Sequence, residues 1–453
     1  MPEHRPLDNA ALTPLIIATL PTHDAAMKTV DPVALLRQAQ ILAEAQRLVE
    51  AERVLAGLPN HPECAFRRAQ LLTALERHAE AEPCFRAVQA MVPGHLDSMV
   101  GLAGALVELG RPGEAVPLLT AAARAQPNSA RIRYLHGVAL DEAGGDASTE
   151  LAVARAMVIA PAERRGLVPW EVYLQISRRC NLRCAMCGHE VWQSNSGFMD
   201  WAVFERTLAE CKANGVKTLH ILSGQGEPLL HPQVFEMLEK AVAEGFEVGI
   251  VTNGTPLTPE RIGRLAGLGL AYIQFSFAGW DKASYEGTYI GAKFERTLDN
   301  LRALDAAVKG TRTSFVVKAV ATEDWEATLE KTAAFLRAQG IERVFTVVGN
   351  NFGGHVQLGR YIEKHGVWSQ KHIDHHRRMP CRVLLKSVGV FCDGTVTACA
   401  CYDSNAELKI GHIMEQGLVE IRNGAPFRRI LESFRCGDLA DIPMCGTCDD
   451  PFG

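Results

Sequence analysis

Three cysteines lie within eight residues near the middle of the chain, at Cys180, Cys184 and Cys187. Spacings of four and three residues fit one tight loop, so all three thiols can converge on one iron–sulfur cube. A cube held entirely by protein takes four thiolates, so three leave one iron open to a small molecule. The segment 170–177 reads as a strand, which puts the loop where active sites of α/β barrels lie. A structural zinc is the alternative, and it would need a fourth ligand such as His189.

Strand and helix patterns alternate from residue 170 to residue 350. Helix signals agree with this alternation, because Asp200 and Thr258 fit N-caps and Gly215, Gly245 and Gly269 fit C-terminal caps. Apolar, β-branched runs of strand length follow the first strand at 217–223, 247–252, 270–277, 313–321 and 343–348. The pattern predicts six β/α units, which form an incomplete parallel barrel open on one side.

Glycine-rich and polar loops follow the second, third and fourth predicted strands. Together with the three cysteines, they resemble the radical S-adenosylmethionine (radical SAM) family, with Met186 where an aromatic residue is usual and Ala278 where an acid is frequent. The resemblance implies a 4Fe–4S cluster on the three cysteines, with S-adenosylmethionine on its open iron. It also implies a cofactor pocket lined by Gly224, Gln225, Gly226, Glu227, Asn253 and Ser276.

A second group of cysteines lies near the end of the chain. The pattern C-x12-G-x4-C followed by C-x2-C resembles twitch, a shortened form of the SPASM auxiliary-cluster domain. The resemblance implies a second 4Fe–4S cluster, serving electron transfer, on the four thiols of Cys381, Cys399, Cys445 and Cys448.

Two further cysteines and several histidines leave alternatives open in this region. Cys401 is an alternative ligand to Cys399, and Cys392 and Cys401 are candidate hydrogen-atom donors to a substrate radical. Zinc is the alternative for the CxxC pair. The run His372, His375 and His376 lies in a polar linker, and we expect it to be solvated surface. We expect a hairpin turning at Asp393-Gly394 and a helix over 419–434.

Prolines recur every 34 residues in the first third of the chain, at Pro59, Pro93, Pro127 and Pro161. The period and the small residues between the prolines resemble tetratricopeptide (TPR) repeats, which are stacked helix–turn–helix units. We expect each proline to end the second helix of a pair, and we expect 162–168 to be a short linker. Stacked repeats leave a concave face for a peptide or a partner protein; a dimerisation or stabilising module is the alternative.

Composition and charge limit the binding partners and the cellular compartment that we expect. The 47 basic and 52 acidic side chains give a net charge of −5, which offers no electrostatic case for nucleic acid or an anionic membrane. The N-terminal segment lacks a basic region before its short apolar run, and no stretch approaches a membrane span. Thirteen cysteines suit a reducing compartment. We therefore expect a cytoplasmic protein.

Together these features predict a multidomain fold. The parts are an extension over 1–30, an all-α TPR superhelix over 31–164, a partial (β/α)6 radical SAM barrel over 165–350, and a linker with a small α+β iron–sulfur domain over 351–453.

The resemblance implies reductive cleavage of S-adenosylmethionine to a 5′-deoxyadenosyl radical, which removes a hydrogen atom from a substrate. A reductant such as flavodoxin or ferredoxin would supply the electron. The single-cluster tail resembles the known dehydrogenase of aminoglycoside assembly, which favours oxidation or epimerisation of a sugar- or aminocyclitol-like molecule. A peptide or protein maturase whose TPR domain holds the substrate is the second hypothesis, and an inactive TPR scaffold is the third.

Overall fold

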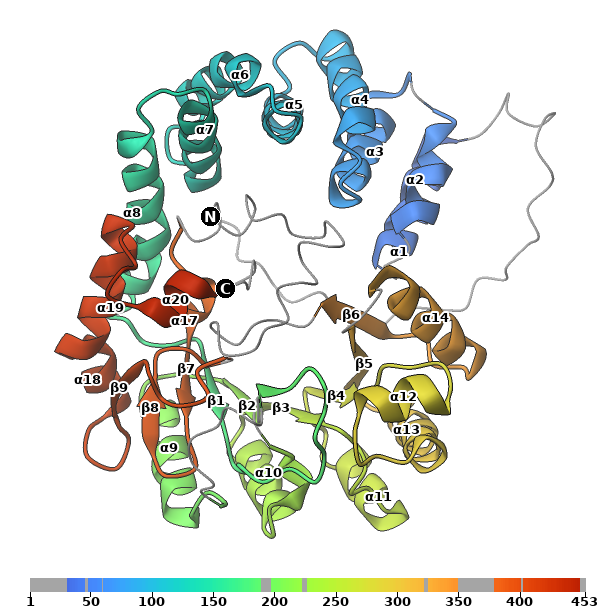
Figure 1. Cartoon of the computed structure of the whole chain (residues 1–453), viewed down its shortest axis with the longest axis vertical. Helices are drawn as coiled ribbons and strands as arrows, with labels where there is room; N and C mark the ends of the chain where they lie inside the picture. The colour runs from blue at the N-terminus through green and yellow to red at the C-terminus, as the bar shows by residue number, and fades with distance from the viewer. Residues whose placement is uncertain are drawn as a thin grey trace. The chain divides into compact units, whose positions relative to one another are not determined.

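The computed structural model describes residues 31–44, 48–58, 60–188, 197–221, 226–321, 325–348, 379–400 and 402–448. Several residues singled out in the sequence lie outside these ranges. They are Gly224, Gln225, Cys401, His189 and the three histidines of the polar linker. The chain divides into two compact units, Met1–Pro93 and Gly94–Gly453. The division falls inside the helical repeats (Figure 1).

The first unit consists of paired helices with a small apolar core. Its helices are α1 (Pro32–Glu44), α2 (Leu48–Ala56), α3 (Pro62–Ala74) and α4 (His78–Met91). Ala51, Leu55 and Cys64 are almost fully buried between them. Glu52 on α2 is only 4% exposed, and its carboxylate accepts from Arg68 at 2.7 Å. A buried acid is costly unless it is paired in this way.

The second unit begins with four more repeat helices. They are α5 (Leu96–Glu108), α6 (Pro112–Ala125), α7 (Ala130–Glu142) and α8 (Ser148–Arg164). The first helices of three successive pairs, α3, α5 and α7, start 34 residues apart. Their N-caps His61, His95 and Ser129 keep the same spacing, and each side chain accepts from the backbone N–H three residues later. The predicted repeat is therefore present in the capping as well as in the helices.

One repeat prediction is wrong at the last pair. Pro161 does not end its helix, because α8 continues through it to Arg164. Helix α8 packs against the C-terminal part of the chain: the Arg155 side chain donates to the carbonyl of Arg435 at 3.0 Å, and Glu163, in the extra turn, pairs with the Arg435 side chain at 2.5 Å. Leu167 in the predicted linker is only 5% exposed. Tertiary contacts override the local effect of proline here.

The described strands form one nine-stranded sheet, in the order β6-β5-β4-β3-β2-β1-β7-β8-β9. The barrel strands are β1 (Glu171–Leu174), β2 (Thr218–Ile221), β3 (Glu247–Thr252), β4 (Tyr272–Ser276), β5 (Ser314–Ala321) and β6 (Val344–Val348). Each pairs in parallel with its sequence neighbour. Parallel neighbours joined by helices confirm the predicted β/α units.

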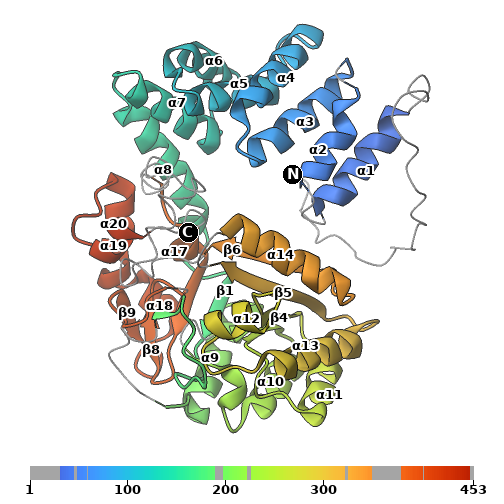
Figure 2. The ribbon, with the colours of Figure 1, turned by 45° about the vertical axis from the view of Figure 1, so that its right-hand side comes forward.

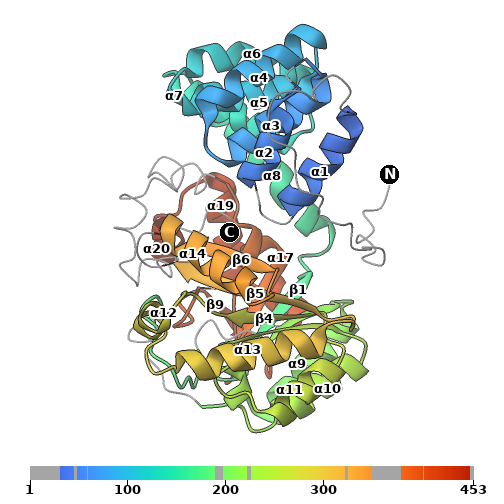
Figure 3. The ribbon, with the colours of Figure 1, turned by 90° about the vertical axis from the view of Figure 1, so that its right-hand side faces the viewer.

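Helices connect these strands and cover the sheet. They are α9 (Trp201–Ala213), the 3-10 turn η2 (Pro228–Leu230), α10 (Val234–Ala243), α11 (Pro259–Gly267), α12 (Lys282–Thr288), α13 (Phe294–Val308) and α14 (Trp325–Ala338). Figure 3 shows α9, α10, α11 and α13 on one face of the sheet. Asp200 and Thr258 are N-caps as predicted, and Gly215, Gly245 and Gly269 follow helix ends with positive φ.

The C-terminal elements extend the same sheet (Figure 2). They are α17 (Arg382–Lys386), β7 (Ser387–Val390), β8 (Thr395–Thr397), β9 (Lys409–His412), α18 (Leu418–Asn423), α19 (Ala425–Cys436) and α20 (Pro443–Thr447). Strand β7 lies parallel to β1, and β7 and β8 form the predicted hairpin with a turn at Gly394. The predicted helical stretch over 419–434 is present as two helices. Gly424 divides them, because this residue has extended backbone and is the N-cap of α19, which has Pro426 in its first turn.

No helix among the described residues is long and apolar enough to span a bilayer.

Candidate active site

The first cysteine loop follows β1, as predicted, and its three thiols lie within electrostatic range of one another. All three cysteines are partly buried. Burial, and after it the charges of Cys187 and Cys180, raise the pKa of the Cys184 thiol to about 12. Met186 beside them is 9% exposed and belongs to the apolar core. Metal coordination would offset the cost of deprotonating such thiols, since a bound metal favours the thiolate.

The loop after β2 contacts the cysteine loop so closely that only glycine fits at Gly226. A Cβ built there would lie 2.4 Å from the carbonyl oxygen of Ser177 and 3.0 Å from that of Arg179. The next residue, Glu227, donates its backbone N–H to the Arg179 carbonyl at 2.8 Å. The two loops are therefore held together by backbone contacts immediately before Cys180.

The Glu227 carboxylate joins this pair of loops to the end of β3. It is 1% exposed and accepts from the Thr252 hydroxyl and the Asn253 N–H, each at 2.7 Å, and from the Leu229 N–H at 3.0 Å. Both carboxylate oxygens are therefore occupied by the chain itself. The Glu227 side chain therefore positions the loop, and the predicted part of this loop in binding the cofactor stays a prediction.

Burial also makes Glu227 sensitive to pH, because it raises the pKa of this carboxyl from 4.5 to about 7 despite the three donors. Between pH 4.5 and pH 7 the Glu227 carboxyl is protonated in the folded chain and ionised in the unfolded chain. The folded chain therefore binds more protons, so its stability falls as pH rises through this window. We expect Glu227 to lower the unfolding free energy by about 3 kcal/mol between pH 4.5 and pH 7.

Chemical denaturation at about pH 5 and about pH 7.5 checks this expectation. The Glu227→Gln chain should lose most of the difference between the two values. The matched variant Glu239→Gln, an exposed position on α10, should keep it. An unchanged difference in Glu227→Gln would contradict the assignment.

Asn253, a predicted cofactor-binding residue, lies beside the cysteine loop. Its amide donates to the Asn181 side chain at 3.2 Å and lies 3.9 Å from the sulfur of Cys180. Its carbonyl oxygen accepts from the Thr255 N–H at 2.9 Å. In return, Asn181 donates to the Thr255 hydroxyl at 2.7 Å. These bonds fix the loop after β3 against the first cysteine.

Ser276 is the last residue of β4 and pairs with Lys318 on β5. Residues on β4 alternate between buried Ile273 and Phe275 and partly exposed Tyr272, Gln274 and Ser276. The predicted cofactor-binding side chain thus belongs to a polar face of the strand, opposite the apolar one.

Sequence reasoning missed a polar network across this polar face. His220 on β2 contacts the Tyr272 hydroxyl at 2.7 Å and the Glu171 carboxylate at 3.0 Å. Gly249 on the intervening strand permits this, because a Cβ there would lie 2.0 Å from the Tyr272 ring. The register places Tyr173, His220, Gly249 and Tyr272 in one row across the sheet. The period-two alternation in each strand was the available signal.

The four predicted ligands of the second site come together from separate elements. Cys381 is the N-cap of α17, Cys399 follows β8, and Cys445 and Cys448 lie on α20 and at its C-cap. Burial raises the pKa of the Cys445 thiol, and the charges of Cys399, Cys381 and Cys448 raise it further. All four thiols therefore lie within electrostatic range of one position.

Cys392 is 5% exposed in the β7–β8 turn, and its charge acts on Arg178. Cys436, by contrast, is exposed at the end of α19.

The donor sets fit iron–sulfur clusters. An iron–sulfur cube takes its thiolates from separate positions around it. His189, the fourth ligand that a zinc at the first site would need, lies outside the described residues. The three and four grouped thiols therefore fit the two predicted clusters.

Arg178 connects the two cysteine sites. It lies two residues before Cys180, and its guanidinium donates to the Ser404 carbonyl at 2.9 Å. The same group lies over the Phe391 ring at 5.6 Å. The Arg178 side chain is 8% exposed, so the strand that leads to the first site is anchored in the domain that carries the second.

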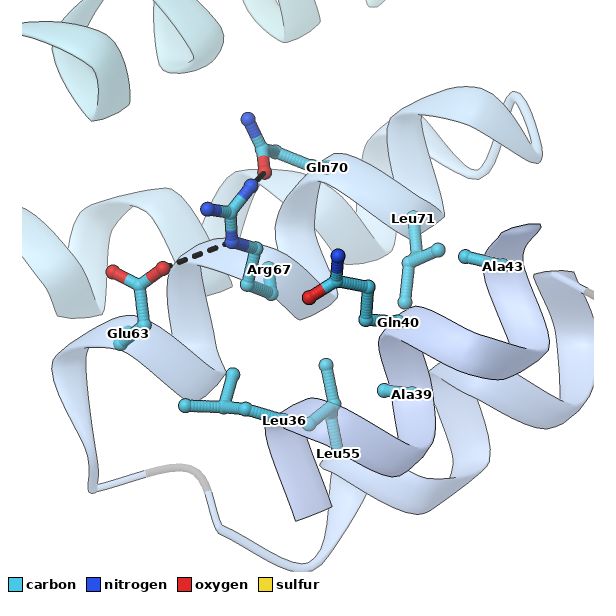
Figure 4. A pocket seen from close by; sticks show the side chains of 9 residues that line it. All are labelled: Leu36, Ala39, Gln40, Ala43, Leu55, Glu63, Arg67, Gln70 and Leu71. Atoms are coloured by element: carbon cyan, nitrogen blue, oxygen red, sulfur yellow. Dashed lines mark hydrogen bonds and ion pairs between the residues drawn. The ribbon is translucent and has the colours of Figure 1, made fainter. Parts of the chain in front are cut away.

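The first unit contains a pocket of about 430 Å³ between α1, α2 and α3 (Figure 4). Leu36, Ala39 and Leu55 line its apolar side. Across from them Arg67 donates to Glu63 at 2.8 Å and to Gln70 at 3.1 Å. The pocket offers an apolar floor with charged and amide groups at its edge.

Comparison with known families identifies each part of the chain. Residues 174–332 match the radical SAM superfamily, 381–449 match the iron–sulfur cluster-binding SPASM domain, and 72–138 match a tetratricopeptide repeat. This chain carries a radical SAM domain. The predicted resemblance, the three-part fold class and the cofactor classes (a 4Fe–4S cluster with S-adenosylmethionine and an auxiliary iron–sulfur cluster) are confirmed.

Individual relatives match part of the chain. The chain is 39% identical over 105 residues to the tungsten-containing aldehyde ferredoxin oxidoreductase cofactor-modifying protein of Pyrococcus furiosus, covering 23% of this chain and 30% of that one. It is 32% identical over 152 residues to the AdoMet-dependent heme synthase of Methanosarcina barkeri, covering 33% and 42%. The chain thus spans less than half the length of either relative.

Among solved structures, SuiB of Streptococcus suis bound to its precursor peptide SuiA is 17% identical, with a TM-score of 0.48, covering 67% of this chain and 75% of that one. BtrN in complex with AdoMet and 2-DOIA is 18% identical, with a TM-score of 0.41, covering 62% and 94%.

Proposed function

We propose that this chain is a radical SAM oxidoreductase acting on a hydroxyl-rich small molecule such as a sugar or aminocyclitol. Cys180, Cys184 and Cys187 would hold the cluster that binds S-adenosylmethionine, and Cys381, Cys399, Cys445 and Cys448 would hold the auxiliary cluster. When bound, the reduced cluster and S-adenosylmethionine supply a 5′-deoxyadenosyl radical that removes a hydrogen atom from the substrate.

The observation that carries the proposal is the presence of two separate thiol groups on adjoining strands of one sheet. The first group follows β1, and the second surrounds the β7–β8 hairpin, with β7 paired to β1. A cluster on the second group of thiols can accept the electron left on a substrate radical. A net two-electron oxidation is then the natural outcome, with flavodoxin or ferredoxin as the external reductant.

The chain's own residues would position and enclose the reactants. Glu227 and Asn253 hold the loops around Cys180 through the bonds described above. The row of Tyr173, His220 and Tyr272 supplies hydroxyl and imidazole groups on the polar face of the sheet. Such groups suit the hydroxyls of a polyol, since a polar substrate requires partners for each buried donor and acceptor.

A peptide or protein substrate is the second candidate, and the pocket in the first unit favours it. Its apolar floor and its Arg67–Glu63 edge are suited to an extended segment with alternating apolar and polar side chains. In this case the repeats would hold the substrate while the sheet carries out the reaction.

Anaerobic reconstitution of the iron–sulfur clusters tests the proposed radical chemistry first. We expect about eight iron atoms per chain, as two 4Fe–4S clusters require, and release of 5′-deoxyadenosine with dithionite and S-adenosylmethionine even without substrate. Cys184→Ala should abolish the release, whereas Cys211→Ala, a buried helix position outside both groups, should retain it. Release by neither the wild type nor any variant would favour an inactive scaffold.

The substrate class is tested by a panel of aminocyclitols and of peptides added to the active protein. Acceleration of 5′-deoxyadenosine release by an aminocyclitol, unaffected by Arg67→Glu, would support the small-molecule proposal. If only peptides accelerate the release, the maturase hypothesis is supported instead. In that case Arg67→Glu should abolish the acceleration, and the control Arg86→Glu, at an exposed position on α4, should retain it.

A further inference from the structure

A short backbone pairing places Tyr289 opposite Cys184. The N–H of Arg183 donates to the Ile290 carbonyl, and the N–H of Ala185 donates to the Thr288 carbonyl, both at 2.9 Å. The residues on either side of the cysteine therefore bond to the residues on either side of the tyrosine. Two segments paired in this antiparallel register bring the middle residues face to face.

The Tyr289 ring is fixed and its hydroxyl is buried. The side chain is 2% exposed, and its ring stacks on Tyr285 with centroids 4.9 Å apart and planes 20° apart. Its backbone N–H donates to the Tyr285 carbonyl at 2.8 Å. The hydroxyl has no hydrogen-bond partner among the described residues. A buried hydroxyl without a partner costs about 1–3 kcal/mol, so one in a fixed ring requires an explanation.

The pKa of Tyr289 agrees with a position opposite Cys184. Burial raises this pKa, and the charge of Cys184 raises it further. A negative charge that opposes ionisation of the phenol also attracts the phenol's hydrogen atom.

We propose that the Tyr289 hydroxyl donates a hydrogen bond to the iron–sulfur cluster at its Cys184 corner and thereby raises the cluster's reduction potential. The inference rests on the proposed function in requiring a cluster on Cys180, Cys184 and Cys187. Hydrogen bonds to cluster sulfurs stabilise the more negative, reduced state and are among the factors that set cluster potentials. Tyr289 is then a positioning and tuning residue, and the cost of burying its hydroxyl is recovered when the cluster is in place.

Tyr285 supplies a matched control within the same stack. It is fully buried, and its ring stacks on that of Tyr289. Burial raises its pKa, a hydrogen bond with the Thr297 hydroxyl lowers it in part, and the charge of Cys184 raises it as well. Tyr285 lies one helical turn before Tyr289 and is not opposite Cys184, so losing its hydroxyl should affect the cluster less.

The test is a redox titration of full-length, reconstituted protein followed by EPR. The cluster on the first site is identified as the reduced signal that changes when S-adenosylmethionine is added, and its midpoint is measured without S-adenosylmethionine. In Tyr289→Phe we expect about a tenfold lower ratio of reduced to oxidised cluster at a fixed solution potential, equivalent to about 59 mV for one electron. Tyr285→Phe should shift this ratio much less.

A second measurement keeps the inference testable if Tyr289→Phe does not fold. Wild-type protein exchanged into D2O should show an exchangeable deuteron strongly coupled to the reduced first cluster. Absence of that deuteron would overturn the inference, as would an unchanged midpoint in Tyr289→Phe or an equal shift in Tyr285→Phe. A wild-type protein with no S-adenosylmethionine-responsive cluster would instead overturn the proposed function.

Discussion

Replacing Arg422 by methionine should destabilise the second unit by about 3–5 kcal/mol, because it leaves several buried carbonyl groups without a donor. Arg422 is fully buried and donates to the carbonyls of Leu167, Leu384, Leu385 and Ser387. Its guanidinium also lies over the Phe427 ring at 4.0 Å. No carboxylate pairs with it among the described residues. Burial lowers the pKa of Arg422, while bonds to several carbonyls favour the charged form.

The measurement is the denaturation midpoint of the anaerobic protein. Arg422→Lys should be intermediate, since one ammonium group cannot reproduce the planar fork of donors. The control Arg428→Met removes an exposed arginine from the neighbouring helix, where it bonds only to Asn423 among the described residues. It should change stability by less than about 0.5 kcal/mol. Equal midpoints for Arg422→Met and Arg428→Met would refute the role assigned to Arg422.

Replacing Gly226 by alanine should reduce 5′-deoxyadenosine release at least tenfold while leaving the first cluster assembled. The added Cβ would lie 2.4 Å from a backbone oxygen, so the loop after β2 must move away from the cysteine loop. Overpacking of this kind costs about 1–3 kcal/mol. The displaced loop would break the 2.8 Å bond from Glu227 to Arg179, and about 1.4 kcal/mol lost from the transition state is already a factor of ten in rate.

Iron content and rate of release distinguish a displaced loop from a lost cluster. The control is Gly263→Ala on α11, where the new methyl group meets nothing within 4 Å. This change should be neutral or slightly stabilising, because alanine favours a helix over glycine. A Gly226→Ala protein with full activity would mean that the contact between the two loops is dispensable.

The features predicted well from sequence are those set by local chemistry. The repeat was predicted from the 34-residue spacing of its prolines, and the hairpin from the turn at Asp393-Gly394. The two cysteine groups were predicted from spacing and family resemblance. Each of these predictions depends only on residues close together in the sequence, or on a motif whose ligands are set by the cofactor.

The features that sequence could not give depend on contacts between distant segments. Pro161 remains inside a helix because α8 is packed against α19. The burial of Arg422 and the register that sets Tyr289 opposite Cys184 both require segments far apart in the chain. The bonds from the Glu227 carboxylate to the end of β3 likewise join segments that are separate in the chain.

The parallel pairing of β1 with β7 has a consequence for how charge moves through the protein. Four residues of each strand are in register, so the backbone leading to one thiol group is tied directly to the backbone leading to the other. Tunnelling rates fall exponentially with the gap an electron must cross. A ladder of backbone hydrogen bonds between β1 and β7 would keep the gap between clusters held by these thiols constant during turnover.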